Sequence, residues 1–335
     1  MEQIKVGMIG TSMISDLFAK GALESGHYTI EAVYSRSKEK AADFGKKYGA
    51  TIFETDLTAF AQRPEIDVVY VASPNSLHFE QAMELLAAKK HVIVEKPAFT
   101  SPDEWEQAVK QAHAHGVKLF EAARHIHEEN FKIASRQIET LGEVKGARLS
   151  FMKYSSRYDQ VLAGQEPNIF SLQFAGGALM DLGVYPLYVA ASWFGEPVSV
   201  EYTAQKIATG VDGNGIGLLR YTDFDVVIQC GKNVTTVAPS EIYGQDYTLV
   251  LDGVTTISSV EKVDVRTKET ETIIKKDAVM TLKEEATDFA QVLLHPEDPE
   301  QIKNYEDWTR LSGIVQRMLY DMRQDADIIF PSDKK

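Results

Sequence analysis

The chain has 335 residues, with 35 lysines and arginines against 49 aspartates and glutamates, so its formal net charge is −14. The sequence contains no lysine- or arginine-rich run of the kind that follows a phosphate backbone, so we expect no nucleic-acid partner. No apolar stretch approaches the roughly 20 residues of a membrane span, and the N-terminal residues lack the features of a signal peptide. We therefore expect a cytoplasmic protein without a membrane partner.

The first 123 residues alternate short apolar runs with amphipathic segments. The runs are residues 4–10, 28–35, 67–73, 91–97 and 118–122. This alternation is typical of βαβ units, in which parallel strands form a sheet covered by helices on both faces. The sequence therefore predicts a doubly wound α/β domain over residues 1–123.

One helix of this region has start and stop signals that can be identified residue by residue. Ser101 is the expected N-cap, Pro102 occupies the first helical position, and Glu104 completes a capping box. Gly116 is expected to end the helix.

The pattern changes after residue 123, where strand-like stretches follow one another without helices between them. This order indicates an α+β domain over residues 124–335, with a large, open, mostly antiparallel sheet and helices on one face. We expect a second copy of the chain to cover the other face, in a homodimer or homotetramer, although polar alternation could leave that face in water. The expected strands are residues 146–155, 198–205, 215–222, 225–231, 247–253, 255–260 and 263–268, and the expected helices are residues 129–142, 176–195, 282–294 and 304–324.

The loop after the first strand is the first candidate ligand site, because ligands of doubly wound sheets bind at the carboxyl ends of the strands. Gly10 permits a tight turn into a helix, but Ser12 and Ser15 stand at the second and third glycines of the fingerprint G-x-G-x-x-G. Their hydroxyls are expected near cofactor phosphates; the alternative is a helix capped by Ser12 with no nucleotide. The expected cofactor contacts of this loop are Gly10, Ser12, Met13 and Ile14.

The loop after the second strand contains Ser35, Arg36 and Ser37. NAD-binding folds usually carry an acid here for the ribose 2′-hydroxyl, and that acid would repel a 2′-phosphate. Arg36 can pair with a 2′-phosphate through two hydrogen bonds instead. We therefore expect NADP(H) as the preferred cofactor, NAD(H) as the alternative, and Ser35 and Arg36 as contacts. The other interpretation of Arg36 is an exposed side chain at a helix start.

Two more loops follow the next strands, at residues 72–78 and 95–97. Lys96 ends an apolar strand and precedes a proline, which aims its ammonium group into the crevice where a nicotinamide would lie. The alternative for Lys96 is a solvated surface charge. The cofactor contacts expected in these two loops are Ser73, Pro74, Asn75, His78, Glu95 and Lys96.

Four motifs together carry a family resemblance: "VGMIG" at the start of the chain, "SPNSLH", "HVIVEKP", and "GGALMDLGVY" in the second half. With these spacings the chain resembles the glucose-fructose oxidoreductase, inositol dehydrogenase and rhizopine-catabolism (Gfo/Idh/MocA) family over nearly its whole length. The resemblance implies an N-terminal Rossmann domain and a C-terminal α+β domain that takes part in oligomerisation. It also implies hydride transfer, without a metal, between NAD(P) and a sugar, polyol or related hydroxyl or carbonyl compound.

The resemblance also implies catalytic residues. Lys96 matches the family's lysine, which hydrogen-bonds the reacting oxygen, and Asp181 and Tyr185 match the second motif. A spacing of four puts both side chains on one face of a helix, so Asp181 is expected to orient the substrate or Lys96. Many members have histidine where this chain has Tyr185, and tyrosine is typical of a branch with glucose-fructose oxidoreductase, dihydrodiol dehydrogenase and xylose dehydrogenase. Either Tyr185 or Lys96 is expected to carry the titrating proton.

Two alternatives to this function remain at this stage. One is an NAD-dependent inositol or sugar dehydrogenase, and the other is an NADP(H)-sensing regulatory protein without turnover. Substrate contacts are expected in a polar loop after the first strand of the second domain and near residues 124–128, where His125, His127 and Glu128 could alternatively chelate zinc if the segment were extended. The expected substrate contacts are His127, Tyr154, Arg157 and Asn168.

Overall fold

The computed structural model describes residues 3–277 and 279–334, which form two compact units. The first unit comprises Met1–Arg124 and Thr281–Gly313, and the second comprises His125–Met280 and Ile314–Lys335. The sequence predicted a single change of domain after residue 123. The segment 281–313 therefore lies with the first unit and not, as expected, with the second.

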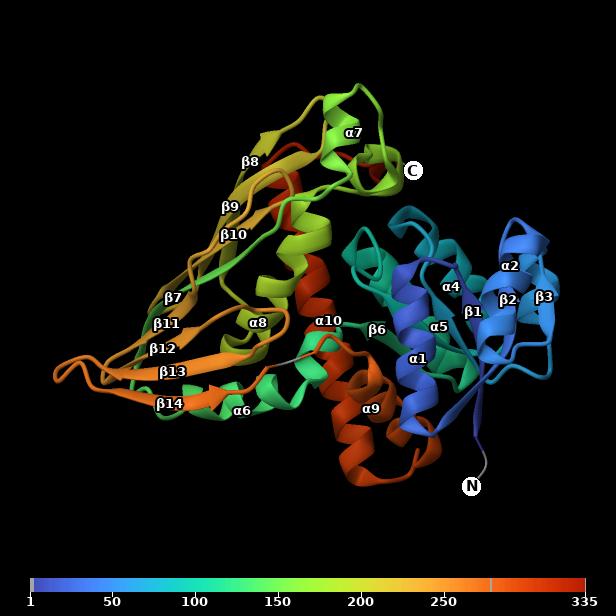
Figure 1. Cartoon of the computed structure of the whole chain (residues 1–335), viewed down its shortest axis with the longest axis horizontal. Helices are drawn as coiled ribbons and strands as arrows, with labels where there is room; N and C mark the ends of the chain where they lie inside the picture. The colour runs from blue at the N-terminus through green and yellow to red at the C-terminus, as the bar shows by residue number, and fades with distance from the viewer. Residues whose placement is uncertain (1–2, 278, 335) are drawn as a thin grey trace. The chain divides into compact units, whose positions relative to one another are not determined.

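A six-stranded parallel sheet forms the centre of the first unit (Figure 1). Its order is β3-β2-β1-β4-β5-β6, so that β1 and β4 are neighbours. β2 and β3 follow on one side of β1, and β4, β5 and β6 follow on the other. All five predicted strands are confirmed; β3 was not predicted, because it has only three residues. The strands are β1 Ile4–Ile9, β2 Tyr28–Tyr34, β3 Ile52–Glu54, β4 Val68–Val71, β5 His91–Glu95 and β6 Leu119–Ala122.

Helices cover both faces of this sheet and enclose two separate apolar cores. The predicted N-cap and C-cap of α5 are confirmed: the Ser101 hydroxyl accepts a hydrogen bond from the Glu104 amide at 3.3 Å, and Gly116 caps the other end in the left-handed conformation. The Glu104 carboxylate accepts from the Thr100 amide at 2.8 Å, one residue before the Ser101 amide that a capping box uses. The helices are α1 Met13–Ser25, α2 Lys38–Gly45, α3 Leu57–Ala61, α4 His78–Ala87, α5 Pro102–His115, α9 Lys283–Leu294 and the first part of α10 Pro299–Asp325, with 3-10 turns at Lys46–Tyr48 and Asn75–Leu77.

Side-chain packing explains why the segment 281–313 belongs to the first unit. The Tyr28 hydroxyl donates to the carbonyl of Ala286 at 2.8 Å, which joins β2 to α9. The ring of Phe120 on β6 stacks on Phe289 at 4.5 Å and meets Tyr305 of α10 edge-on at 5.4 Å. These residues cover one face of the parallel sheet, which needs helices on both faces to bury its apolar strands.

An eight-stranded sheet forms the second unit, in the order β14-β13-β12-β11-β7-β10-β9-β8. Only the β7–β10 pair is parallel among its described pairs, so the predicted open, mostly antiparallel sheet is confirmed. β11 and β14 were not predicted. In place of the two strands expected at 255–260 and 263–268 there is one strand, β13, which overlaps the end of the first and the start of the second. It ends at Asp264, whose carboxylate accepts hydrogen bonds from the amides of Arg266 and Thr267 in the turn that follows. The strands are β7 Val144–Met152, β8 Ser199–Lys206, β9 Asp212–Arg220, β10 Asp225–Gly231, β11 Ser240–Gly244, β12 Tyr247–Leu251, β13 Ser259–Asp264 and β14 Thr270–Lys275.

Helices lie against one face of this sheet within the second unit (Figure 1). The opposite face carries mixed polar and apolar side chains, including Ile216, which is 53% exposed. Self-association through that face stays a prediction. The helices are α6 Glu129–Ile138, α7 Tyr158–Leu162, a π-helix Leu179–Gly183 followed by α8 Val184–Phe194, and the last part of α10, with 3-10 turns at Arg124–His127, Asn168–Phe170, Leu172–Phe174 and Pro331–Lys334.

The segment Leu172–Phe194 has the length and apolar composition of a membrane span, with a mean hydropathy of 1.3. The expectation that no apolar stretch approaches that length is therefore wrong. In this structure 78% of its most apolar stretch is buried inside the protein, and a buried core helix can have the same length and composition. Its apolar character is explained by packing against the large sheet.

His91, at the start of β5, makes a testable link between stability and pH. Its Nδ1 accepts a hydrogen bond from the Lys118 amide at 2.9 Å, and burial lowers the pKa of the ring to about 4. Because the folded chain disfavours the charged ring, stability is complete above the unfolded pKa of about 6.5 and falls as pH drops from there towards 4, by up to ~3 kcal/mol. Urea unfolding of the wild type and of His91→Asn across this range should show a shallower fall in the variant. Parallel curves would contradict the assignment.

Candidate functional site

The four predicted cofactor loops follow β1, β2, β4 and β5, which are neighbours in one parallel sheet. Because parallel strands run the same way, their carboxyl ends meet at one edge, and all four loops lie along it. The strand order reverses between β1 and β4, and that is where doubly wound folds bind their ligands. The structure therefore brings the predicted loops together in the first unit.

Gly10 makes the turn after β1 possible. Its φ of +102° is a conformation that other residues rarely adopt, and a Cβ there would lie 2.6 Å from the carbonyl oxygen of Ala72. Ser15 is buried, and its hydroxyl lies 3.4 Å from the position of that Cβ and 3.4 Å from the Ser12 hydroxyl. Ser15 thus fills the close contact between helix and strand, and its burial argues against the expected contact with a phosphate.

The N-terminus of α1 is suited to an anion. Ser12 is its N-cap in an extended conformation, and its side chain makes no capping hydrogen bond to the helix. Met13, in the first turn, is 76% exposed. The amides of a helix N-terminus carry partial positive charge and bind phosphate groups, so this turn fits the pyrophosphate of a dinucleotide.

Arg36 lies exposed in the turn between β2 and α2. The two flanking hydroxyls are used locally: Ser37 is the N-cap of α2 and accepts from the Lys40 amide at 3.3 Å, and the Ser35 hydroxyl accepts from the Ser37 amide at 3.4 Å. These bonds fix the turn and leave the guanidinium at its surface. The site presents a cation where an NAD-binding fold presents an acid.

His78 holds two of the loops together. Its Nδ1 lies 3.2 and 3.1 Å from the carbonyls of Pro97 and Ala98, and its Nε2 lies 2.8 Å from the carbonyl of Ser73. The ring is buried, and burial lowers its pKa. Both nitrogens face the protein's own backbone, so the expected cofactor contact from the ring is not supported, and His78 instead supports the loops after β4 and β5. Asn75 and Pro74 lie partly buried in the first of these loops.

Glu95 and Lys96 have different settings although they are adjacent. The Glu95 carboxylate is buried, accepts a hydrogen bond from the Tyr70 hydroxyl, and accepts one from the Lys96 amide at 3.2 Å. Burial raises the pKa of this carboxyl, and the positive charge of Lys96 acts against the rise. Glu95 therefore anchors the end of β5 from inside, whereas Lys96 remains partly exposed at the ligand-binding edge.

The glycine pair of "GGALMDLGVY" opens the helical segment that carries Asp181 and Tyr185. A Cβ on Gly176 would lie 2.6 Å from the backbone of Ile169, and one on Gly177, whose φ is +121°, would lie 2.1 Å from the carboxylate of Asp212. That buried carboxylate accepts hydrogen bonds from the amides of Ala178 at 3.0 Å and Leu179 at 2.7 Å.

The carboxylate of Asp212 also accepts from the Tyr202 hydroxyl at 2.7 Å. Asp212 therefore caps the helical segment with an ionisable group, although burial raises the pKa of this carboxyl. Sequence analysis missed it, because in "GVDGNG" it has the appearance of a turn residue.

Asp181 lies in the π-helix and not, as predicted, in a regular α-helix. Wide turns of this kind occur often at functional sites. The Asp181 carboxylate pairs with the Lys232 ammonium at 2.7 Å. Tyr185, one residue into α8, is partly buried, with its ring 4.9 Å from His125 and 5.4 Å from Phe151.

Three of the four predicted substrate residues belong to an exposed, structured loop. Tyr154 is exposed and donates its hydroxyl to Asp159 at 2.6 Å. Arg157 is exposed at the start of α7, and Asn168 is exposed at the start of the 3-10 turn Asn168–Phe170. Phe170 and Val161 pack with Val211 under this loop, so its polar residues are held on a small apolar core.

His127 has a different environment. The segment Arg124–His127 is a 3-10 turn, not the extended segment in which His125 and His127 would share a face. His127 is 1% exposed, which argues against the substrate contact predicted for it. Within residues 3–277 and 279–334, no group of three or more histidine, cysteine, aspartate or glutamate side chains is arranged to hold a metal ion.

Two family models match the chain. One, described as an oxidoreductase family with an NAD-binding Rossmann fold, covers residues 4–123, and the GFO/IDH/MocA C-terminal domain covers residues 136–250. A relative named scyllo-inositol 2-dehydrogenase (NADP(+)) IolU, from Bacillus subtilis, is 34% identical over 333 residues, 99% of both chains. The chain belongs to the Gfo/Idh/MocA family.

A second relative is also an oxidoreductase, and a solved structure has the same fold. The Escherichia coli oxidoreductase YgjR, described as uncharacterized, is 35% identical over 330 residues, 98% of both chains. The structure of KijD10, a 3-ketoreductase from Actinomadura kijaniata in complex with NADP and TDP-benzene, superposes with a TM-score of 0.82 at 24% identity, covering 97% of this chain and 98% of that one. The Gfo/Idh/MocA chain described here is an NAD(P)-binding oxidoreductase, a dehydrogenase or reductase.

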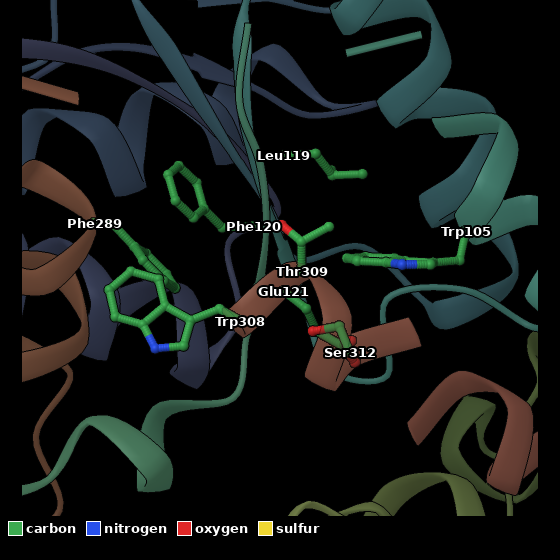
Figure 2. A pocket seen from close by; sticks show the side chains of 8 residues that line it. All are labelled: Trp105, Leu119, Phe120, Glu121, Phe289, Trp308, Thr309 and Ser312. Carbon is green, nitrogen blue, oxygen red and sulfur yellow. The ribbon is translucent and has the colours of Figure 1, made fainter. Parts of the chain in front are cut away.

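A small cavity in the first unit of this Gfo/Idh/MocA protein has none of the predicted site residues in its lining. Figure 2 shows aromatic and polar side chains from α5, β6, α9 and α10 around it. The Glu121 carboxylate at its edge accepts a hydrogen bond from the Ala98 amide at 2.9 Å, a bond within the protein. The lining residues are Trp105, Leu119, Phe120, Glu121, Phe289, Trp308, Thr309 and Ser312.

Proposed function

We propose that this oxidoreductase is an NADP(H)-preferring dehydrogenase or reductase that acts on a cyclic polyol or sugar. The observation that carries the proposal is the exposed arginine in the β2–α2 turn, beside a glycine turn and helix N-terminus that fit a pyrophosphate. The 34% identical relative, named for scyllo-inositol and NADP(+), supports the same choice of cofactor and substrate.

Residues of the first unit would hold the cofactor. Gly10 and the first turn of α1 would receive the pyrophosphate, and Arg36 would pair with the 2′-phosphate. Ser35, Ser73, Pro74 and Asn75 would contact the remaining groups from their loops. The bound nicotinamide supplies the hydride donor or acceptor.

Three side chains carry the proposed chemistry. Lys96 donates a hydrogen bond to the reacting oxygen and favours negative charge on it. Tyr185 takes the hydroxyl proton during oxidation and returns it during reduction, and a proton transfer of this kind contributes about 100- to 10,000-fold to rate. Asp181, paired with a buried lysine and still 34% exposed, orients a substrate hydroxyl.

The direct test follows the absorbance of the reduced cofactor while the protein oxidises scyllo-inositol, other inositols and simple sugars, with NADP⁺ giving NADPH and NAD⁺ giving NADH. We expect turnover of a cyclic polyol or sugar with a higher kcat/KM for NADP⁺. Equal kcat/KM for the two cofactors would refute the pairing of Arg36 with the 2′-phosphate. Tight NADPH binding without turnover of any polyol, sugar or matching ketone would favour the regulatory alternative.

Arg36→Ala should separate the two cofactors. Loss of charge-assisted hydrogen bonds to the 2′-phosphate should raise the Kd for NADPH by about 10- to 100-fold, corresponding to roughly 1.5–3 kcal/mol. The Kd for NADH should stay within about threefold, because NADH lacks that phosphate. Fluorescence titration measures both. Arg310→Ala, which removes an exposed arginine of α10 in the same unit, is the matched control and should change neither Kd. A parallel loss for both cofactors would contradict the assignment.

A further inference from the structure

Lys232, which follows the last residue of β10, is a buried lysine of the second unit. Its side chain is 1% exposed. Burying an ammonium group costs free energy unless an opposite charge and hydrogen bonds compensate it. The partners of Lys232 therefore indicate its role. Sequence analysis did not single it out, since a lysine directly after a strand is usually solvated.

The partners of Lys232 come from two parts of the predicted substrate site. Nζ lies 2.7 Å from Oδ2 of Asp181 and donates to the carbonyl of Ile169 at 3.0 Å. It also lies 4.6 Å from the centre of the Phe170 ring, within the range of a cation–π contact. One ammonium thus joins the π-helix to the 3-10 turn that begins at Asn168.

The backbone of Lys232 is also hydrogen-bonded on both sides. Its amide donates to the carbonyl of Gly213 at 2.7 Å, and its carbonyl accepts from the Ser155 amide at 2.8 Å. The second bond reaches the loop that carries Tyr154 and Arg157. Lys232 therefore lies where the start of β9, the end of β10 and the polar loop meet.

The pair has a buried end and an accessible end. Lys232 is enclosed, whereas the Asp181 side chain keeps 34% of its surface exposed. A carboxylate anchored from behind by an ammonium is held in one position and presents an acceptor to a donor arriving from its exposed side. A substrate hydroxyl is such a donor.

We propose that Lys232 is a positioning residue for this enzyme: it ties the Asp181 carboxylate to the Asn168–Phe170 turn and holds it in one position, so that the carboxylate binds a hydroxyl group next to the reacting carbon. The proposal rests on the function proposed for Asp181. It limits the substrate class to compounds with at least two neighbouring oxygen functions, as in cyclic polyols and sugars. Lys232 itself does not touch the substrate.

The test is a double-mutant cycle with scyllo-inositol and NADP⁺ as the probe reaction. Lys232→Met should lower kcat/KM by about 10- to 100-fold in the wild-type chain, the range of a lost charge-assisted hydrogen bond. In the Asp181→Asn background the same change should lower it by less than about threefold, because Lys232 acts through Asp181. Lys232→Arg should recover part of the loss. Lys145→Met, which removes an exposed lysine of β7, should leave kcat/KM unchanged.

Equal losses from Lys232→Met in both backgrounds would overturn the proposal, because they would show a purely structural effect. Amide hydrogen exchange tests the role of Lys232 without a measurement of activity. In Asp181→Asn and in Lys232→Met, exchange should quicken over residues 168–177, where the Gly177 amide bonds to the Ile169 carbonyl at 3.1 Å, and it should not quicken in Lys145→Met. Unchanged exchange in Asp181→Asn would overturn the proposal even if Lys232→Met failed to fold. If the wild type turned over no polyol but the two variants showed the expected faster exchange, only the proposed function would be refuted.

Discussion

Tyr185→Phe is expected to reduce kcat by about 100- to 10,000-fold, the range contributed by a single general acid or base. Phenylalanine keeps the aromatic ring that lies between His125 and Phe151, so the fold around α8 should persist and the loss should come from the hydroxyl. Steady-state kinetics with a turned-over polyol and NADP⁺ measures the effect. The NADPH Kd should stay within about threefold, since the proposed phosphate contacts lie in the first unit.

Tyr320→Phe is the matched control for this change, because it removes a phenolic hydroxyl from α10 while the ring keeps its place over the Arg323 guanidinium. It should leave kcat within about twofold. A Tyr185→Phe enzyme with wild-type kcat would remove tyrosine from the proposed chemistry. The pH profile of the residual activity then shows which group titrates: a limb that persists without the hydroxyl belongs to another group, with Lys96 the next candidate.

Lys96→Met should also reduce kcat by at least about 100-fold, because the reacting oxygen loses a charged hydrogen-bond donor. Lys110→Met, an exposed position on α5 of the same unit, is its control. If Lys96→Met and Tyr185→Phe both kept wild-type turnover, the proposed mechanism would be wrong.

The sequence was most informative where local rules and packing agree. The parallel strands could be predicted because each is an apolar run between amphipathic segments, and α5 because its cap, proline and terminal glycine all give the same boundaries. The failures have physical causes. β3 is too short for a periodic pattern, and the turn at Asp264 depends on side-chain bonds to amides that a hydropathy pattern does not contain.

The candidate site was predictable in its loops and not in its supports. Strand ends point to Gly10, Arg36 and Lys96, since all parallel strands finish at one edge. Lys232 and Asp212 were missed because their partners are distant in sequence and each resembles a common surface residue until the fold surrounds it.

His78 and Ser15 were predicted to lie near the cofactor, and their burial argues against both contacts. Both lie in ligand-binding loops, yet both turn inward, because closely spaced loops need side chains to hold them in place. Position in a motif therefore predicted which loops lie along one edge of the sheet better than it predicted which way each side chain turns.

Asp212→Ala is expected to lower the free energy of unfolding of the second unit by about 4 kcal/mol, because three buried donors each lose their acceptor at about 1–3 kcal/mol apiece. The donors are the amides of Ala178 and Leu179 and the hydroxyl of Tyr202. Calorimetry should show a transition lowered by roughly 10 °C. Asp212→Asn should be milder, since an amide oxygen can still accept. Asp223→Ala, an exposed aspartate between β9 and β10, is the control and should change stability by less than about 0.5 kcal/mol.

Gly177→Ala tests the same contact from the other side. Its Cβ would lie 2.1 Å from Oδ1 of Asp212, at a φ of +121° that disfavours any side chain, so we expect a loss of about 3–5 kcal/mol from clash and strain together. The two losses should not add. Removing the carboxylate makes room for the methyl group, so Gly177→Ala should cost less in the Asp212→Ala background, and only the backbone strain should remain. Full additivity would mean that the glycine pair is required for backbone conformation alone. The carboxylate that caps the helix of Asp181 and Tyr185 would then have no part in selecting the glycine.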